Sequence, residues 1–275
     1  VQLYYVGTTV TNDGVFVPLR VTAEPLPDDG EVVDWAGYTV QFIEGTTDLC
    51  VNDADRATHQ SVKPLFVGDV SDVGTAHCLY DGFSGIRNGT PHVVTAQLLD
   101  PDGSVIATLE VDVLVFANTQ QVTTGGGNLE LFESGGQLAA IEGSKKNFGY
   151  KGDSGKGNKD PSGDINIVYD YEDAAGMKLY QIKAPTINST GTVKPAGGHP
   201  WAEVTGTADL IDVTSSQNPI VLLTDLLVQV EATDNAPDSV AYSVWDATGY
   251  LIFATNWNGY EPVEQGLSGG NIDIK

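Results

Sequence analysis

Short stretches of alternating apolar and polar residues run through the whole chain and constrain its fold more than any other feature. In SVIATLEVDVLVF, residues 104–116, and in AYSVWD, residues 241–246, β-branched and aromatic residues dominate. Clusters of Asp, Asn, Gly and Pro interrupt such stretches, and no long segment follows the 3.6-residue period of an amphipathic helix. We therefore expect an all-β protein.

One turn signature occurs three times between apolar runs, with Asp first and Gly fourth. It stands in LLDPDGSVIAT (98–108), YEDAAGMKLYQI (171–182) and VWDATGYLIFAT (244–255). This pattern predicts a type I turn followed by a glycine in the left-handed region, a common hairpin connection. Three hairpins are expected, in which the Asp side chain accepts hydrogen bonds from the amides of its own turn.

A boundary is expected near FANTQQVTTGGGN, residues 116–128, where a strand pattern gives way to polar and glycine-rich sequence. We expect two consecutive β-sandwich domains, Ig-like or jelly-roll-like, over residues 1–118 and 119–275. GGGNLEL (125–131) is echoed by GGNIDIK (269–275), with glycines ahead of alternating apolar residues. The echo predicts paired or neighbouring strands that bound the second domain.

The chain has two cysteines, Cys50 and Cys78, both in its first half. No CxxC pair is present, and His77 beside Cys78 lacks partners at metal-ligand spacing. An even pair in a secreted protein is best explained as one disulfide, which would close a loop of about 28 residues. We therefore predict a Cys50–Cys78 disulfide.

The charge is extreme, because 13 Lys and Arg residues stand against 37 Asp and Glu residues and give a net charge of −24. Binding to nucleic acid or to an anionic membrane through bulk electrostatics is excluded on this ground. So many carboxylates fit a halophilic or marine origin and offer oxygen ligands to Ca²⁺, but an ordinary acidic extracellular surface explains them equally well.

The setting is expected to be extracellular, either at the cell surface or secreted. The chain begins at Val1 and contains a single methionine, Met177, as removal of a signal peptide or propeptide would require, although a fragment would look the same. No apolar run approaches the roughly 20 residues that cross a bilayer, so we expect no membrane insertion.

Two parts of the chain resemble bacterial and archaeal surface proteins. TPHVVTAQLLDPDGSVIATLEVDVLVF, residues 90–116, is similar to the closing strands of Ig-like surface repeats. Four stretches resemble, in order, a C-terminal β-module of secreted multi-repeat surface proteins, over nearly all of residues 122–275: VTTGGGNLEL, GSKKNFGYKGDSGKGNKDPSGDINIVYDY, SVWDATGYLIFATNWNGY and SGGNIDIK. The resemblance implies a cell-surface setting and no catalytic residues.

Three acidic turn sequences are candidates for Ca²⁺, with plain turn chemistry as the alternative: NDADR (52–56), DPDGS (100–104) and DNAPDS (234–239). None has the spacing of an EF-hand. Their candidate ligands are Asp53, Asp55, Asp100, Asp102, Asp234 and Asp238.

Two segments are candidates for contacts between copies of the chain. The first strand, VQLYYVGTTV (1–10), either pairs within its own sandwich or adds to the sheet edge of a neighbour. A lysine-rich, glycine-rich segment, 143–159, is either a solvated hairpin or a basic loop that meets the acidic face of the next copy. The candidate assembly residues are Val1, Leu3, Tyr5, Lys145, Lys146, Lys151, Lys156 and Lys159.

Two of the four tryptophans, Trp201 and Trp257, lie at expected strand ends and are candidates for stacking on sugar rings, with ordinary packing as the alternative. Two Asn-x-Ser/Thr sequons, at Asn88 and Asn188, are candidates for N-glycosylation.

Catalysis finds little support in the sequence. The four histidines are scattered, and neither HExxH nor GxSxG is present. A glycosidase needs only two carboxylates, but small sandwiches do not favour it. We expect a non-enzymatic structural protein that assembles with itself or other surface proteins into a layer, filament or matrix, with calcium as a potential stabiliser. The alternative is an adhesion or glycan-binding module.

Overall fold

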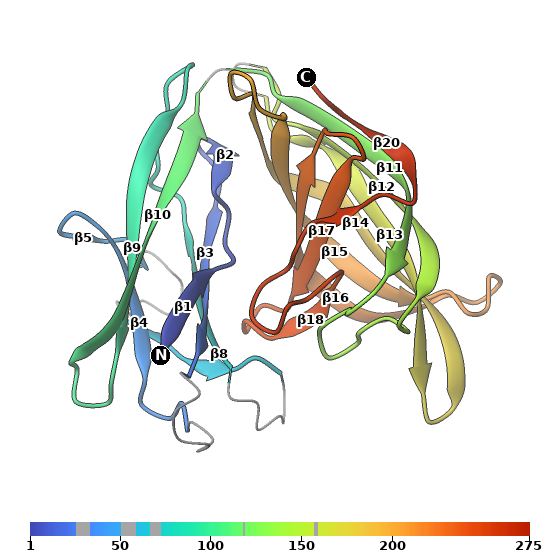
Figure 1. Cartoon of the computed structure of the whole chain (residues 1–275), viewed down its shortest axis with the longest axis horizontal. Helices are drawn as coiled ribbons and strands as arrows, with labels where there is room; N and C mark the ends of the chain where they lie inside the picture. The colour runs from blue at the N-terminus through green and yellow to red at the C-terminus, as the bar shows by residue number, and fades with distance from the viewer. Residues whose placement is uncertain (26–33, 51–58, 67–72, 118, 157–158) are drawn as a thin grey trace. The chain divides into compact units, whose positions relative to one another are not determined.

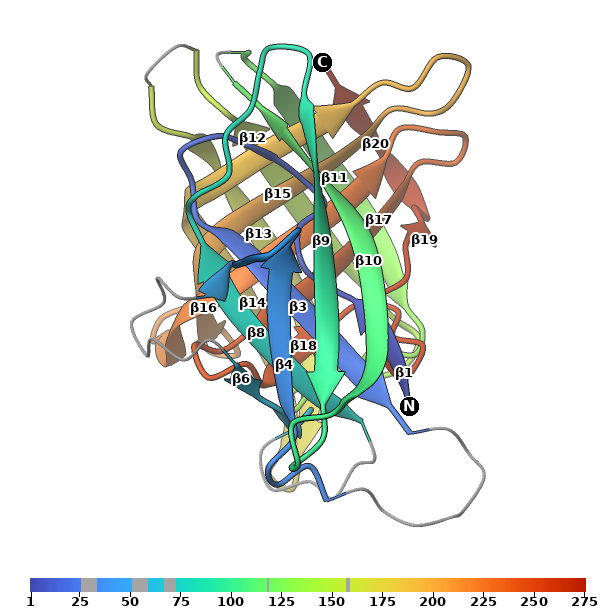
Figure 2. The ribbon, with the colours of Figure 1, turned by 90° about the vertical axis from the view of Figure 1, so that its left-hand side faces the viewer.

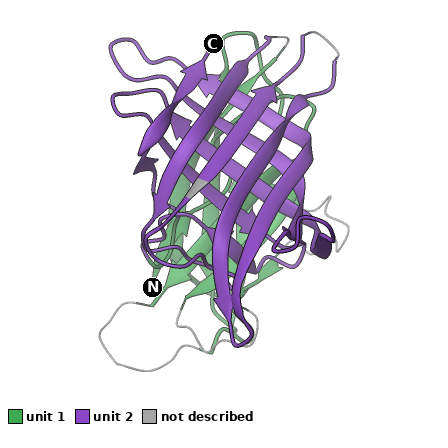
Figure 3. Ribbon diagram, turned by 90° about the vertical axis from the view of Figure 1, so that its right-hand side faces the viewer, with its two compact units in different colours: residues 1–117, 259–261 green, residues 118–258, 262–275 purple. Residues whose placement is uncertain are grey.

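The structure is a computed structural model that describes residues 1–25, 34–50, 59–66, 73–117, 119–156 and 159–275. Every regular element assigned in these ranges is a β-strand, so the expected all-β class is confirmed. The chain divides into two compact units, coloured separately in Figure 3. Unit 1 holds residues 1–117 and 259–261, and unit 2 holds residues 118–258 and 262–275.

Unit 1 contains two sheets, and Figure 1 labels their longer strands. One sheet has the order β1-β3-β8-β7, and the other has the order β2-β10-β9-β4-β5, with β6 on β4. The strands are β1 (Gln2–Tyr5), β2 (Val10–Asn12), β3 (Val17–Glu24), β4 (Thr39–Glu44), β5 (Thr47–Asp48), β6 (Gln60–Ser61), β7 (Lys63–Pro64), β8 (Gly74–Tyr80), β9 (Thr90–Leu99) and β10 (Val105–Phe116).

The two sheets of unit 1 pack on each other around one core, as a sandwich does. Figure 2 shows β4, β9 and β10 side by side, with β3 and β8 behind them. Leu19 on β3 and Ala76 on β8 belong to the same buried cluster as Phe42 on β4 and Val94 on β9. Alternate residues of strands from both sheets therefore supply this core.

The predicted disulfide is confirmed. Cys50, just after β5, is bonded to Cys78 on β8, and the two Cα atoms are 5.9 Å apart. Both residues are fully buried in the core of unit 1. The bond therefore joins the segment after β5, a strand of one sheet, to β8, a strand of the other sheet.

The first strand has a partner within its own unit. β1 pairs with β3 in antiparallel register, with Leu3 opposite Ala23 and Tyr5 opposite Val21. Leu3 is buried in the core, and Val1 and Tyr5 pack against it. The pairing with β3 agrees with the first of the two interpretations, and because β1 lies at the edge of its sheet, a contact of Val1, Leu3 and Tyr5 with a neighbouring copy stays a prediction.

Unit 2 is one antiparallel sheet with the order β18-β17-β16-β15-β14-β13-β12-β11-β20, and β19 pairs with β17. Its strands are β11 (Val122–Leu131), β12 (Ser144–Asp153), β13 (Ser162–Asp173), β14 (Gly176–Val193), β15 (Trp201–Asp212), β16 (Ile220–Thr233), β17 (Ser239–Trp245), β18 (Leu251–Ala254), β19 (Gln265–Gly266) and β20 (Gly269–Ile274).

This sheet curves back on itself around a single core. The ring of Tyr169 on β13 stacks on Phe253 on β18 with centroids 4.4 Å apart, and Phe148 on β12 meets Tyr242 on β17 at 5.6 Å. These pairs join strands that are five places apart in the sheet order. Figure 3 shows the strands of unit 2 crossing in two layers.

The two echoed phrases form neighbouring strands, because β11 and β20 pair along the sheet with Gly125 opposite Ile272 and Asn128 opposite Gly269. The glycines lie inside β11, whereas the sequence suggested that they precede it. A Cβ atom on Gly125 would lie 2.3 Å from Cε1 of Tyr150. Glycine is needed there because the tyrosine ring fills the space on the core side of the strand.

The three predicted turns are present, between β9 and β10, β13 and β14, and β17 and β18. Their glycines have positive φ angles, at Gly103 (81°), Gly176 (110°) and Gly249 (98°). In the first turn, Oδ1 of Asp100 accepts from the amides of Asp102 at 3.0 Å and Ser104 at 2.8 Å. The aspartate therefore acts as a turn former.

Candidate functional site

An apolar groove lies on the outer face of unit 2, over β14, β15 and the start of β16. Leu179, Gln181 and Lys183 alternate along β14 with Tyr180 and Ile182, which point into the core. The groove encloses about 530 Å³. We call it the hairpin groove, and its lining residues are Leu179, Gln181, Lys183, Ile211, Val213, Ser216, Pro219 and Val221.

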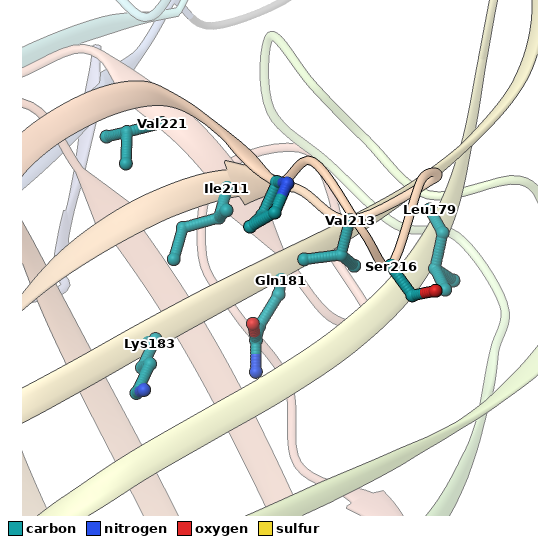
Figure 4. A pocket seen from close by; sticks show the side chains of 8 residues that line it. Leu179, Gln181, Lys183, Ile211, Val213, Ser216 and Val221 are labelled. Atoms are coloured by element: carbon teal, nitrogen blue, oxygen red, sulfur yellow. The ribbon is translucent and has the colours of Figure 1, made fainter.

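Backbone pairing places the lining side chains beside one another. Gln181 stands opposite Ile211, and Ile211 stands opposite Val221 on the third strand. The amide of Val213 donates to the carbonyl oxygen of Leu179 at 2.8 Å. Figure 4 shows these side chains, with Ser216 on the loop that joins β15 to β16. The groove is therefore built mainly on paired strands, and its shape is set before any partner arrives.

The loop from β15 to β16 is fixed by Asp212 and Thr214. Oδ1 of Asp212 accepts from the Thr214 amide at 2.9 Å, and the Thr214 hydroxyl oxygen accepts from the Leu179 amide at 2.9 Å. Hydrogen bonds from the side chain and backbone of Thr214 hold the pKa of the Asp212 carboxyl below its ordinary value. One wall of the groove is tied to β14 in this way.

Three exposed apolar residues begin β16 beside the groove. Ile220 is 59% exposed, Val221 is 53% exposed and Leu222 is 40% exposed. We call these three residues the hairpin tip, and the groove and tip together the hairpin patch. The first buried residue of this strand is Leu226, so the end of the hairpin extends beyond the core.

Irregular pairing explains why this end is exposed. Leu210 stands opposite Leu223 but the next residue, Ile211, stands opposite Val221, which leaves Leu222 as an extra residue on β16. Asp225 has a φ angle of 56°, in the left-handed region. Such bulges bend a strand and redirect its side chains, so the apolar start of β16 faces solvent instead of the core.

The chemistry of the hairpin patch suits contact with an apolar surface. An antiparallel sheet with one solvated face normally alternates apolar residues inward and polar residues outward. Here both faces carry apolar residues at the end of the β15–β16 hairpin, and the groove contains one lysine and no carboxylate. Contiguous exposed apolar patches of this kind mark interaction sites.

The three acidic turns predicted as calcium sites lie in separate parts of the chain. Asp53 and Asp55 lie outside the described residues, and Asp100 and Asp102 belong to the β9–β10 turn. Asp234 lies in the connection between β16 and β17. Within the ranges that the structure describes, no group of three or more His, Cys, Asp or Glu residues is arranged to hold a metal ion.

Asp238, the sixth candidate ligand, has a structural role. Its Oδ1 accepts from the Asn235 amide at 3.1 Å, and its Oδ2 accepts from the Ile272 amide at 2.7 Å. Since Ile272 lies on β20, this carboxylate ties the turn before β17 to the last strand of the sheet.

The lysines of residues 143–159 lie on β12 and in the loop after it. Lys145 stands opposite Glu130 on β11, and Lys151 stands opposite Asp164 on β13. Lys156 and Lys159 are exposed in the loop, and Lys146 lies on β12. Two of these charges therefore face carboxylate-bearing neighbours in the same sheet, which weakens the case for a free basic patch.

The two tryptophan candidates lie in unit 2, and contacts of the ring are seen for Trp257. The Trp257 amide donates to the carbonyl oxygen of Glu133 at 2.7 Å, and its ring lies 6.4 Å from that of Trp245. A Cβ on Gly135 would meet the Trp257 ring at 2.5 Å, so the ring lies directly over this glycine. Trp201 begins β15 and is half-buried. The structure therefore favours packing over sugar stacking for Trp257.

The two sequons differ in access. Asn88 is exposed in the turn before β9. Asn188 lies on β14, where its amide nitrogen donates to the Thr207 hydroxyl oxygen at 3.2 Å. Of the two, Asn88 is the one that presents an exposed side chain to a modifying enzyme.

His92 is the histidine with a carboxylate beside it, but both of its ring nitrogens are engaged. Nδ1 lies 2.8 Å from Oε1 of Glu44 on β4, and Nε2 lies 2.8 Å from the carbonyl oxygen of Ser84. The imidazole therefore joins β9, β4 and the segment before β9, which is a structural arrangement.

The hairpin patch was missed by the sequence analysis. IVLLTDLLVQV, residues 220–230, has the composition of a buried strand, so its start gave no sign of exposure. The run of Ile, Val and Leu was a signal for apolar contact, but the sequence alone does not show whether the partner is the core or another molecule.

Comparisons with known proteins give no relative with which the hairpin groove can be compared. No protein-family model matches the chain, and searches of curated proteins and of solved structures found no match. In the ranges listed above, no helix is long and apolar enough to cross a membrane.

Proposed function

We propose that this protein is a non-enzymatic, extracellular structural protein that assembles with copies of itself through the hairpin patch. The observation that carries the proposal is the apolar surface at the end of the β15–β16 hairpin, formed by the groove on the outer face of the sheet and by the exposed side chains of Ile220, Val221 and Leu222. Leaving this surface in water costs free energy, and association removes it from water. The Cys50–Cys78 disulfide is compatible with an oxidising, extracellular setting.

The charge of the chain bears on how it would assemble. Copies that each carry a net charge of −24 repel one another at low ionic strength. Salt screens this repulsion, since the Debye length falls from about 30 Å at 0.01 M to about 3 Å at 1 M. Association through an apolar patch is therefore expected to strengthen as salt is added, whereas association through charge pairs would weaken.

Size-exclusion chromatography with light scattering, followed by negative-stain microscopy, tests the proposal. The protein is measured over a range of concentrations in low and high NaCl, with Ca²⁺ and with EDTA. Association that grows with protein and salt concentration is the expected result, and the EDTA arm tests whether calcium contributes. A monodisperse monomer in every condition would refute self-assembly.

A further inference from the structure

We infer that the partner of the hairpin groove is the hairpin tip of a second copy, in a two-fold contact where each copy gives its tip and receives the other's. This inference rests on the proposed function and specifies its contact. In such an isologous contact the same surface serves both subunits, so it must be self-complementary. The hairpin patch meets this condition because a concave and a protruding apolar surface lie next to each other on one sheet.

Val221 belongs to both the tip and the groove lining, but Ile220 does not fill the groove of its own copy. Val221 lines the groove, and successive residues of a strand point to opposite faces, so Ile220 points away from the face on which the groove lies. Leu222 is the extra residue of the bulge. The side chains of Ile220 and Leu222 therefore remain available to a partner.

The hairpin patch is the part of this acidic chain where the charge allows a second copy to approach. With 37 acidic and 13 basic residues, most of the surface of one copy repels another. The lining of the groove contains no carboxylate, and its one charged residue, Lys183, is basic. The tip, Ile220 to Leu222, is uncharged. The lining residues therefore add no carboxylate to the contact, and the nearby Asp209 on β15 stands opposite Lys183.

Two substitutions test the tip and the groove separately. Ile220→Asp places a charge on the tip and leaves the groove lining unchanged. Leu179→Lys places a charge in the groove and leaves the tip unchanged. Each is expected to weaken self-association by about a hundredfold or more, because each removes a buried side chain twice in a two-fold contact.

Mixing the two variants gives the decisive result. In a mixed pair, the wild-type tip of the Leu179→Lys copy can enter the wild-type groove of the Ile220→Asp copy. At the second contact, the introduced carboxylate of one copy meets the introduced ammonium group of the other, but only if the tip enters the groove. Sedimentation velocity is therefore expected to show a heterodimer in the mixture at concentrations where each variant alone is monomeric. Val105→Asp is the matched control, since Val105 is 49% exposed on a hairpin of unit 1 and this change is expected to leave association unchanged.

Each outcome decides a different claim. If the wild-type chain associates and both variants still associate as well as the wild type, the tip-in-groove contact is wrong while self-assembly stands. If both variants become monomeric and their mixture also stays monomeric, the patch is used but not by insertion of one copy's tip into another's groove. A wild-type chain that never associates overturns both. Circular dichroism and thermal unfolding establish that the variants are folded.

Discussion

Replacing Tyr242 with Phe is expected to stabilise unit 2. Tyr242 lies on β17 and is fully buried, and among the described residues its hydroxyl has no hydrogen-bond partner. Burial raises the pKa of this tyrosine well above its ordinary value. A buried hydroxyl without a partner costs about 1–3 kcal/mol. Phenylalanine keeps the ring that packs against Phe148 and removes the hydroxyl, so the free energy of unfolding should rise by about 1 kcal/mol.

Tyr150→Phe is the matched control and is expected to have the opposite effect. Tyr150 is also buried in the core of unit 2, but its hydroxyl lies 3.2 Å from Oγ1 of Thr123, which is itself fully buried. Removing the tyrosine hydroxyl deletes this hydrogen bond and leaves the threonine hydroxyl without it. The free energy of unfolding should fall by about 1 kcal/mol.

Urea denaturation followed by tryptophan fluorescence measures both variants. The two midpoints should move in opposite directions while the slope of the unfolding free energy with urea stays the same. Destabilisation by Tyr242→Phe of about 1 kcal/mol or more would refute the reasoning, because it would show that the hydroxyl makes a favourable bond in the core.

Three further predictions test other parts of the structure. Replacing Cys50 and Cys78 together with Ala should lower the free energy of unfolding of unit 1 by about 3–4 kcal/mol, because the disulfide closes a 28-residue separation; urea denaturation measures this, and an unchanged midpoint would contradict it. Above pH about 10, the free energy of unfolding should fall, because the raised pKa of Tyr242 keeps it protonated in the folded protein while the unfolded chain ionises; absorbance at about 295 nm should show this tyrosine titrating only on unfolding, and free titration in the folded protein would contradict its burial. In a host that performs N-glycosylation, mass spectrometry of the secreted protein should find glycan on Asn88 and none on Asn188, since the latter is engaged with Thr207 on a strand; glycan on Asn188 would contradict this.

Local patterns in the sequence were enough to predict the all-β class and the three hairpin turns. The Asp and Gly residues of the three hairpins act through bonds within a few residues, as Asp246 does toward the amides of Thr248 and Tyr250. Such chemistry depends little on the rest of the fold. The disulfide was also predictable, because two cysteines allow only one intramolecular pairing.

Features that depend on distant residues were not predictable. The ring of Tyr150 explains the glycine at position 125, but the two residues meet only when β11 and β12 pair. The exposure of Ile220 depends on bulges in β16, and a change of one residue in register reverses which face a side chain occupies. Val1 to Tyr5 illustrate the same limit, since the strand that pairs with them, β3, begins only at Val17.

Hydrogen exchange at two protein concentrations tests the central claim most directly. Peptides that cover residues 211–223 should exchange more slowly in a concentrated, high-salt sample than in a dilute one, because the hairpin patch is then covered by a second copy. Peptides that cover the β9–β10 turn, residues 99–105, should exchange equally in both samples. Equal exchange of residues 211–223 in samples that light scattering shows to be associated and dissociated would contradict the account.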